Sequence, residues 1–165
     1  MKNKNFLVFG GTGNIGSIII NILSEKNLKF VSFSKKKLTS NKSNLSLDIN
    51  KKISKKKSNI INSSDIIIFA LKKKDPNSSF ISDLSKLIYY ELIFPLSIID
   101  QHDNKNKTFI FLNSDSIFNM RSKKIYILSK LISYFLTTKI LKKFYKSKFK
   151  TLILTKRANK NKIIL

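Results

Sequence analysis

Every glycine of this chain lies in one short segment, and the glycine spacing there is typical of a phosphate-binding turn. The segment follows an apolar run, precedes a helical period, and reads Gly10, Gly11, Thr12, Gly13, Asn14, Ile15, Gly16. Glycines at this spacing let backbone N–H groups at the start of a helix approach a pyrophosphate closely. A tight turn without a ligand has a similar pattern, but the strand–turn–helix context favours dinucleotide binding.

The end of the next predicted strand bears on which dinucleotide would bind. An acidic residue usually ends this strand and binds the ribose 2′-hydroxyl of NAD. Here the strand is followed by Ser34, and Lys35 begins a run of three lysines. A hydroxyl and an ammonium suit a 2′-phosphate, so we expect NADP rather than NAD as the cofactor. A solvated lysine run is the alternative.

A tyrosine and a lysine farther along the chain could carry out proton transfer. Tyr126 and Lys130 are four residues apart, which places them on one face of a helix. A nearby ammonium lowers the pKa of a phenol, which suits proton exchange with a carbonyl or an alcohol. Lysine is so abundant here that such a pair arises by chance about once, so its weight depends on context. Ser114 lies twelve residues before Tyr126, at the C-terminal end of the predicted fifth strand, where its hydroxyl could hydrogen-bond a substrate oxygen.

These residues need a scaffold, and the hydrophobic pattern predicts one of alternating strands and helices. Apolar and β-branched runs predict six strands, over residues 6–9, 29–33, 45–47, 66–70, 108–112 and 149–155. Apolar residues at helical period predict helices over 14–26, 80–99 and 125–145, the second kinked at Pro95. Such alternation predicts parallel strand pairing. We therefore expect one domain over 1–165, an α/β doubly wound parallel sheet (Rossmann fold) with helices on both faces.

The composition limits the classes of site and partner. The chain has no cysteine and one histidine, His102, in a polar stretch, so we expect a solvated loop residue there and no metal site. The net charge of +24 suggests a nucleic-acid partner, yet only Arg121 and Arg157 of the 33 basic residues are arginine. Scattered lysines with abundant asparagine and isoleucine instead indicate a compositional bias. Because neither a signal pattern nor a long apolar stretch is present, we expect a cytoplasmic protein with no nucleic-acid or membrane partner.

In these motifs the chain resembles the short-chain dehydrogenase/reductase family, over almost its whole length up to about Thr155. The matching parts are the glycine loop, the strand leading to Asp48, the strand ending at Ala70, a serine after the fifth strand, and the Tyr126–Lys130 pair. The resemblance implies an NAD(P)-dependent oxidoreductase that transfers hydride between nicotinamide and a carbonyl or alcohol substrate.

The same resemblance implies a role for each site residue. Tyr126 would be the general acid/base, and Lys130 would lower its pKa and hold the nicotinamide ribose. Ser114 would polarise the substrate carbonyl, with Ser116 as a second candidate for that role. Asp48 would accept a hydrogen bond from the adenine amino group, and Ala70 would lie beside the cofactor.

Three departures from the family pattern bear on activity. Phe69-Ala70-Leu71-Lys72 stands where an Asn-Ala-Gly segment is usual, and Glu91 aligns best with the usual catalytic asparagine. A carboxylate accepts a proton but cannot donate through an amide N–H. The chain ends at Leu165, before the usual substrate-binding segment, so we expect a shortened substrate half. The alternatives are a degenerate, non-catalytic dinucleotide-binding protein or partner subunit, and a basic nucleic-acid-binding module.

The two long predicted helices also suggest an oligomer. Helices 80–99 and 125–145 carry more apolar surface than one sheet face can cover. Family members commonly pair these helices across a two-fold axis, so we expect a homodimer. Coverage of both helices within the monomer is the alternative.

Overall fold

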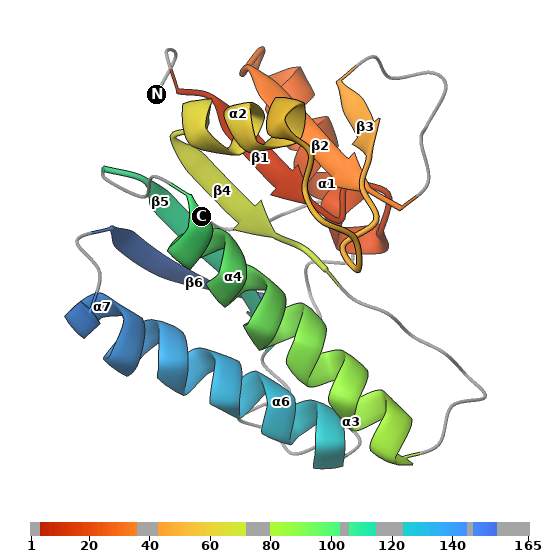
Figure 1. Ribbon diagram of the computed structural model, residues 1–165, viewed down its shortest axis with the longest axis vertical. Coiled ribbons are helices and arrows are strands. Elements are labelled where there is room, and N and C mark those ends of the chain that lie inside the picture. Colours follow the sequence, from red (N-terminus) through yellow and green to blue (C-terminus); the bar gives the residue numbers. More distant parts are fainter. Residues whose placement is uncertain are drawn as a thin grey trace.

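A computed structural model describes residues 4–35, 43–71, 80–102, 106–114, 124–144 and 147–154. In this part of the chain six parallel strands form one sheet with the order β3-β2-β1-β4-β5-β6 (Figure 1). The chain winds outward from β1 in one direction and then, from β4, in the other. The predicted α/β doubly wound sheet is therefore confirmed. The strands are β1 (Phe6–Phe9), β2 (Phe30–Ser34), β3 (Asn44–Ser46), β4 (Ile66–Phe69), β5 (Thr108–Ser114) and β6 (Lys148–Leu154).

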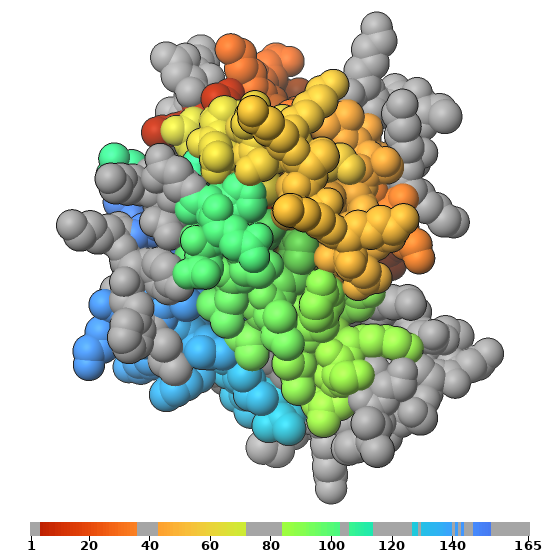
Figure 2. Space-filling model, viewed as in Figure 1, coloured from red at the N-terminus to blue at the C-terminus, as the bar shows by residue number. Residues whose placement is uncertain are grey.

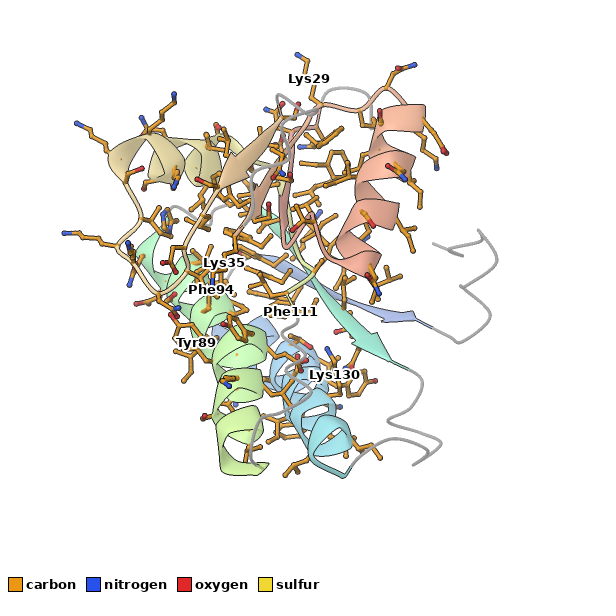
Figure 3. The ribbon with its side chains drawn as sticks, turned by 90° about the vertical axis from the view of Figure 1, so that its right-hand side faces the viewer. Lys29, Lys35, Tyr89, Phe94, Phe111 and Lys130 are labelled. Carbon is orange, nitrogen blue, oxygen red and sulfur yellow. The ribbon has the colours of Figure 1, made fainter. Side chains whose placement is uncertain are left out.

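The helices form two layers, one on each face of the sheet. In Figure 1, α1 lies behind the sheet, whereas α2, α4 and α6 lie in front of it, and the rotated view of Figure 3 agrees. The α-helices are α1 (Asn14–Glu25), α2 (Lys55–Ser63), α3 (Phe80–Ile88), α4 (Phe94–Gln101), α6 (Lys124–Phe135) and α7 (Leu141–Phe144). Two π-helical turns, η1 (Tyr89–Ile93) and η2 (Leu136–Ile140), join α3 to α4 and α6 to α7.

The strands are buried on both faces, as expected for a parallel sheet covered by helices. Along β1, Leu7 and Phe9 pack toward α2 and α4, and Phe6 and Val8 pack toward α1. Phe9 is central to the larger cluster, where its ring stacks on Phe69 with centroids 5.4 Å apart. Packing in the core therefore fixes the register of β1 relative to β4. It also fixes the position of the segments that follow these two strands.

Helix α2 is an element that the sequence pattern does not predict. Its residues are mostly polar, and Ile61 is its only buried side chain among the described residues. A buried lysine from outside the helix holds its C-terminal end. The Lys107 ammonium donates hydrogen bonds to the carbonyl oxygens of Ile61, Asn62 and Ser64 at 3.2, 2.6 and 2.7 Å. Since a cation is favourable where helix carbonyls lack partners, tertiary contact compensates for a weak amphipathic pattern.

The kink predicted at Pro95 is present as the π-helical turn η1. Proline has no N–H to donate to the carbonyl of Glu91, four residues earlier, so the α-helical ladder is interrupted there. The N–H of Phe94 donates instead to the carbonyl oxygen of Tyr89, five residues back. This wider turn leaves Glu91 facing the interior, where it is 7% exposed.

His102 is not the solvated loop residue that we expected. It follows the end of α4 and is half-buried, with its Nδ1 3.2 Å from the carbonyl oxygen of Ile98. Burial lowers the pKa of His102, the hydrogen bond to Ile98 raises it in part, and the charge of Lys107 lowers it further. The net direction is below the ordinary value, because partial loss of water disfavours the charged imidazolium.

The folded protein is therefore expected to lose stability as the pH falls through the ordinary histidine range. The unfolded chain binds the proton at His102 more readily, so the contribution is complete above a pH of about 6.5 and declines below it. Thermal unfolding of wild type and His102→Gln at pH 7.5 and 5.5 tests this, because Asp and Glu titrate at lower pH. The wild type should lose more stability than the variant, and equal losses would contradict the assignment.

Candidate functional site

The carboxyl edge of the sheet gathers most of the predicted site residues. Because the strands run parallel, the segments after β1, β2, β4 and β5 emerge at the same edge. These segments are the glycine loop, Lys35, Ala70 and the end of β5 at Ser114. Open α/β sheets bind ligands at this edge, where the strand order reverses.

Three of the four glycines are required by the fold itself. A Cβ on the buried Gly11 would come within 2.7 Å of the Cβ of Ser32. Gly10 has φ +88°, and a Cβ there would come within 2.5 Å of the carbonyl oxygen of Ala70. A Cβ on Gly16 would collide with the backbone of Gly10, so helix α1 can start close to β1 only without one. These glycines would be needed in a turn that binds nothing, because their constraints are internal.

Gly13 differs, because the fold does not require glycine at this position. It has an extended backbone, φ −76° and ψ 163°, that any residue adopts. It is exposed, and a Cβ would approach nothing closer than the carbonyl oxygen of Gly10 at 3.3 Å. The loop neighbours Thr12, Asn14 and Ile15 are exposed as well. The open face in front of Gly13 can therefore receive a group from outside the protein.

In the described part of the chain, no side chain caps the start of helix α1, so its first N–H groups are available to such a group. Gly13 is its N-cap and supplies no side chain to the first-turn N–H groups, and no acidic side chain lies in that turn. These N–H groups carry the positive end of the helix dipole, which favours a phosphate oxygen. The geometry fits the pyrophosphate of a dinucleotide, which a Cβ at Gly13 would displace.

The two polar residues after β2 lie in different environments. Ser34 is 5% exposed, and its hydroxyl donates to the Oδ1 of Asn44 at 2.9 Å. Its proton is therefore directed inward, which does not support the expected donor role at a ribose 2′ position. Lys35 is exposed at the carboxyl end of β2, and Figure 3 labels it at the end opposite Lys29.

Asp48 lies just beyond β3 and is exposed. Its Oδ1 accepts a hydrogen bond from the N–H of Asn50 at 3.1 Å, which closes the turn after the strand. Ala70 follows β4, where its N–H donates to the carbonyl oxygen of Phe9. Both positions are at the carboxyl edge of the sheet, where the resemblance implies a contact with the cofactor.

The structure describes only some of the proposed catalytic side chains. Helix α6 contains Tyr126 and Lys130 one turn apart, and Ser114 is the last residue of β5. The side chains of Ser114 and Tyr126, and the whole of Ser116, lie outside the described part of the chain. The Lys130 side chain is described and buried, and its Nζ donates to the carbonyl oxygen of Leu112 at 3.1 Å (Figure 3). Its ammonium is thus held close to the end of β5.

Glu91 is a site residue to which the sequence assigned no role. Its Oε1 lies 2.8 Å from the Nζ of Lys130, and their side chains are 5% and 10% exposed. Two signals were available: the alignment of Glu91 with the usual catalytic asparagine, and Pro95 four residues later, which predicts a break in the helical ladder beside the carboxylate. The sequence does not show which way a kinked helix turns that side chain, because the direction depends on packing against α6.

Within the described ranges, no three His, Cys, Asp or Glu side chains lie close enough together to hold a metal ion. No helix in that part of the chain has the length and apolar composition needed to cross a membrane.

No protein-family model matches the sequence, and no curated protein matches it by sequence. The structure is similar to several solved structures, among them those of short-chain dehydrogenase/reductase proteins. A superfamily protein from Agrobacterium tumefaciens with bound NAD aligns with a TM-score of 0.65 and 14% identity, over 92% of this chain and 48% of that one. Alternative dihydrofolate reductase 1 from Brucella suis, in complex with NADP, gives 0.67 and 12%, over 94% and 75%. A short-chain dehydrogenase/reductase from Saccharomyces cerevisiae gives 0.69 and 16%, over 93% and 70%.

This chain therefore spans about half the length of the Agrobacterium protein and a larger share of the other two. At such low identity the likeness concerns the fold alone. The resemblance expected from the sequence is confirmed at the level of the fold: the chain has a Rossmann-type α/β fold similar to that of these three proteins.

Proposed function

We propose that this chain binds a nicotinamide dinucleotide at the carboxyl edge of its sheet and transfers hydride between that cofactor and a carbonyl or alcohol. The observation that carries the proposal is Gly13, a glycine that the fold does not need, in front of an uncapped helix N-terminus. Structural neighbours with bound NAD or NADP support the same class of ligand.

The cofactor would supply the hydride, and the residues of this chain would bind, orient and exchange the proton. The glycine loop would hold the pyrophosphate, and Asp48 would accept a hydrogen bond from the adenine amino group. Lys130 would hold the nicotinamide ribose. Tyr126 would give a proton to the substrate oxygen or take one from it, and Ser114 would orient that oxygen.

We further propose a preference for NADP, now based on Lys35 alone. Its exposed ammonium would face a 2′-phosphate, an interaction worth up to about 1 kcal/mol at the surface, or roughly fivefold in affinity. Fluorescence titration with NADPH and NADH at moderate salt tests both the class of ligand and the preference. Lys35→Met should remove the difference, and Lys29→Met, an exposed lysine before the same strand, should keep it. Tighter binding of NADH by the wild type would contradict the preference, and binding of neither would contradict the proposed function.

A non-catalytic dinucleotide-binding protein is the second candidate, and one observation favours it. Lys130 is held in a buried ion pair with Glu91, which weakens the positive field available to activate Tyr126. Such a protein would bind NADPH but would not oxidise it in the presence of any aldehyde, ketone or keto-sugar. Turnover with one of these substrates would exclude this candidate.

We also propose that the protein is a homodimer that pairs its α6 helices. Leu128, Leu131 and Phe135 recur at the i, i+3, i+7 spacing of one helical face and are 51%, 41% and 58% exposed. Helices α3–α4 and α6 lie side by side at the surface in Figure 2. An exposed apolar stripe of this kind is typical of an interface, and a two-fold axis would place it against its own copy.

Phe135→Glu is expected to convert the dimer to a monomer, because it places a charge in the apolar contact. Light scattering at micromolar concentration measures the mass. Ile18→Glu is the matched control, since Ile18 is an exposed isoleucine on α1, at the opposite face of the sheet. A monomeric wild type, or a dimer that survives Phe135→Glu but not Ile18→Glu, would contradict this interface.

A further inference from the structure

The buried ion pair of Glu91 and Lys130 joins the two helices beside the proposed catalytic edge. Oε1 of Glu91 and Nζ of Lys130 are 2.8 Å apart, and each side chain is at least nine-tenths buried. Apart from this ion pair, neither carboxylate oxygen has a hydrogen-bond partner among the described residues, although both are buried. A carboxylate with an unused acceptor is expensive to bury, so its presence calls for an explanation beyond packing.

Hydrogen bonds to strand β5 hold Lys130 in place. The Lys130 ammonium donates to the carbonyl oxygen of Leu112, and the Asn113 side-chain amide donates to the carbonyl oxygen of Lys130, each at 3.1 Å. These two bonds tie α6 to the carboxyl end of β5. The ammonium therefore has a fixed position at the edge where the cofactor is proposed to bind.

The carboxylate is positioned by the π turn η1. The break imposed by Pro95 turns Glu91 inward, and the neighbouring Tyr89 hydroxyl donates to the carbonyl oxygen of Ile49 at 2.9 Å. The turn is thus attached to the segment after β3 on one side and to α6 on the other. Neither charge can move away from its partner without disturbing one of these attachments.

Pairing with the carboxylate weakens the electric field of the ammonium at a distance. An isolated ammonium would repel a positively charged ring nearby, whereas an ammonium with a carboxylate at contact distance acts as a dipole whose field falls off quickly. The oxidised nicotinamide ring carries one more positive charge than the reduced ring. The balance of charge at this point of the site would therefore set the relative affinity for the two cofactor states.

We propose that Glu91 is a positioning residue that fixes Lys130 and cancels its charge, so that the site accepts the oxidised and the reduced cofactor with comparable affinity. This inference rests on the proposed function, because it requires the nicotinamide to lie near Lys130. Glu91 acts through Lys130 and is not itself assigned contact with the reacting atoms.

A cycle of neutral variants tests the proposal by the ratio of two dissociation constants, that of the oxidised cofactor over that of the reduced one. Glu91→Gln removes the negative charge beside the ammonium and should raise the ratio about tenfold, the effect of a unit charge at roughly 10 Å and an effective dielectric constant near 20. Lys130→Gln leaves the carboxylate uncompensated and should lower the ratio. The double variant removes both charges and should return the ratio to near the wild-type value.

Controls separate this role from a structural one. Glu25→Gln removes the chain's other glutamate, which is exposed at the end of α1, and should leave the ratio unchanged. A purely structural role would weaken binding of both cofactor states equally. If Glu91→Gln does not fold, the double variant is compared with Lys130→Gln, and the ratio should rise from the single to the double variant. A ratio unchanged across folded, binding variants overturns this inference alone, whereas a wild type that binds neither state overturns the proposed function as well.

Discussion

Gly13→Val is expected to abolish binding of the reduced cofactor while the protein remains folded. The backbone conformation at Gly13 is open to any residue, and the nearest atom to an added Cβ is the Gly10 carbonyl oxygen at 3.3 Å. The loop needs to yield only slightly to admit that atom. The branched side chain would instead occupy the space in front of α1, where the pyrophosphate is proposed to lie.

The expected loss is about 100-fold or more in affinity. Hydrogen bonds to a charged group contribute about 1.5–3 kcal/mol each, so losing one or two of them accounts for that factor. NADPH fluorescence titration measures the affinity, and thermal unfolding measures the stability. Asn21→Val introduces the same side chain at an exposed position farther along α1 and should bind as the wild type does.

Gly10→Ala should behave in the opposite way to Gly13→Val. Its φ of +88° and the contact of an added Cβ with Ala70 make the substitution unfavourable to the fold itself. A large fall in the unfolding temperature is therefore expected for Gly10→Ala and a small one for Gly13→Val. If Gly13→Val binds NADPH as tightly as the wild type, the loop is a turn without a ligand.

Tyr126→Phe is expected to remove turnover and to leave cofactor affinity nearly unchanged. The substitution deletes the phenolic proton but keeps the ring, and general acid–base groups contribute about 10²- to 10⁴-fold in rate. The measurement is NADPH oxidation with a panel of aldehydes, ketones and keto-sugars, beside NADPH titration. Tyr134→Phe, two turns farther along α6, is the matched control and should keep the wild-type rate. A loss below about threefold in Tyr126→Phe would assign proton transfer to another group.

The strand pattern was predictable because parallel strands covered on both faces must be apolar. Phe6–Phe9 and Ile66–Phe69 are continuous apolar runs, and the structure pairs them side by side in register. The glycine loop was predictable for a similar reason. Where two backbone segments approach as closely as they do at Gly10 and Gly16, there is no room for a Cβ, and glycine is the only residue type without one.

Helix α2 could not be predicted from its own residues. Its hydrophobic signal is weak, and its C-terminal end depends on Lys107, which is 43 residues from Ser64 in the sequence. A pattern within a short window contains no information on a partner that far away. The direction of the Ser34 hydroxyl could not be predicted for the same reason, because it depends on Asn44 in the neighbouring strand.

By itself, the sequence determined the alternation of strands and helices, the position of the glycine turn, and the break at Pro95, because each depends on local backbone chemistry. Tertiary structure alone decided the distribution of charge at the carboxyl edge of the sheet, where catalysis is proposed. Glu91 and Lys130 are 39 positions apart and lie on different helices, yet their charged atoms are 2.8 Å apart. Burial makes that distance matter, because two charges removed from water are stable only as a pair.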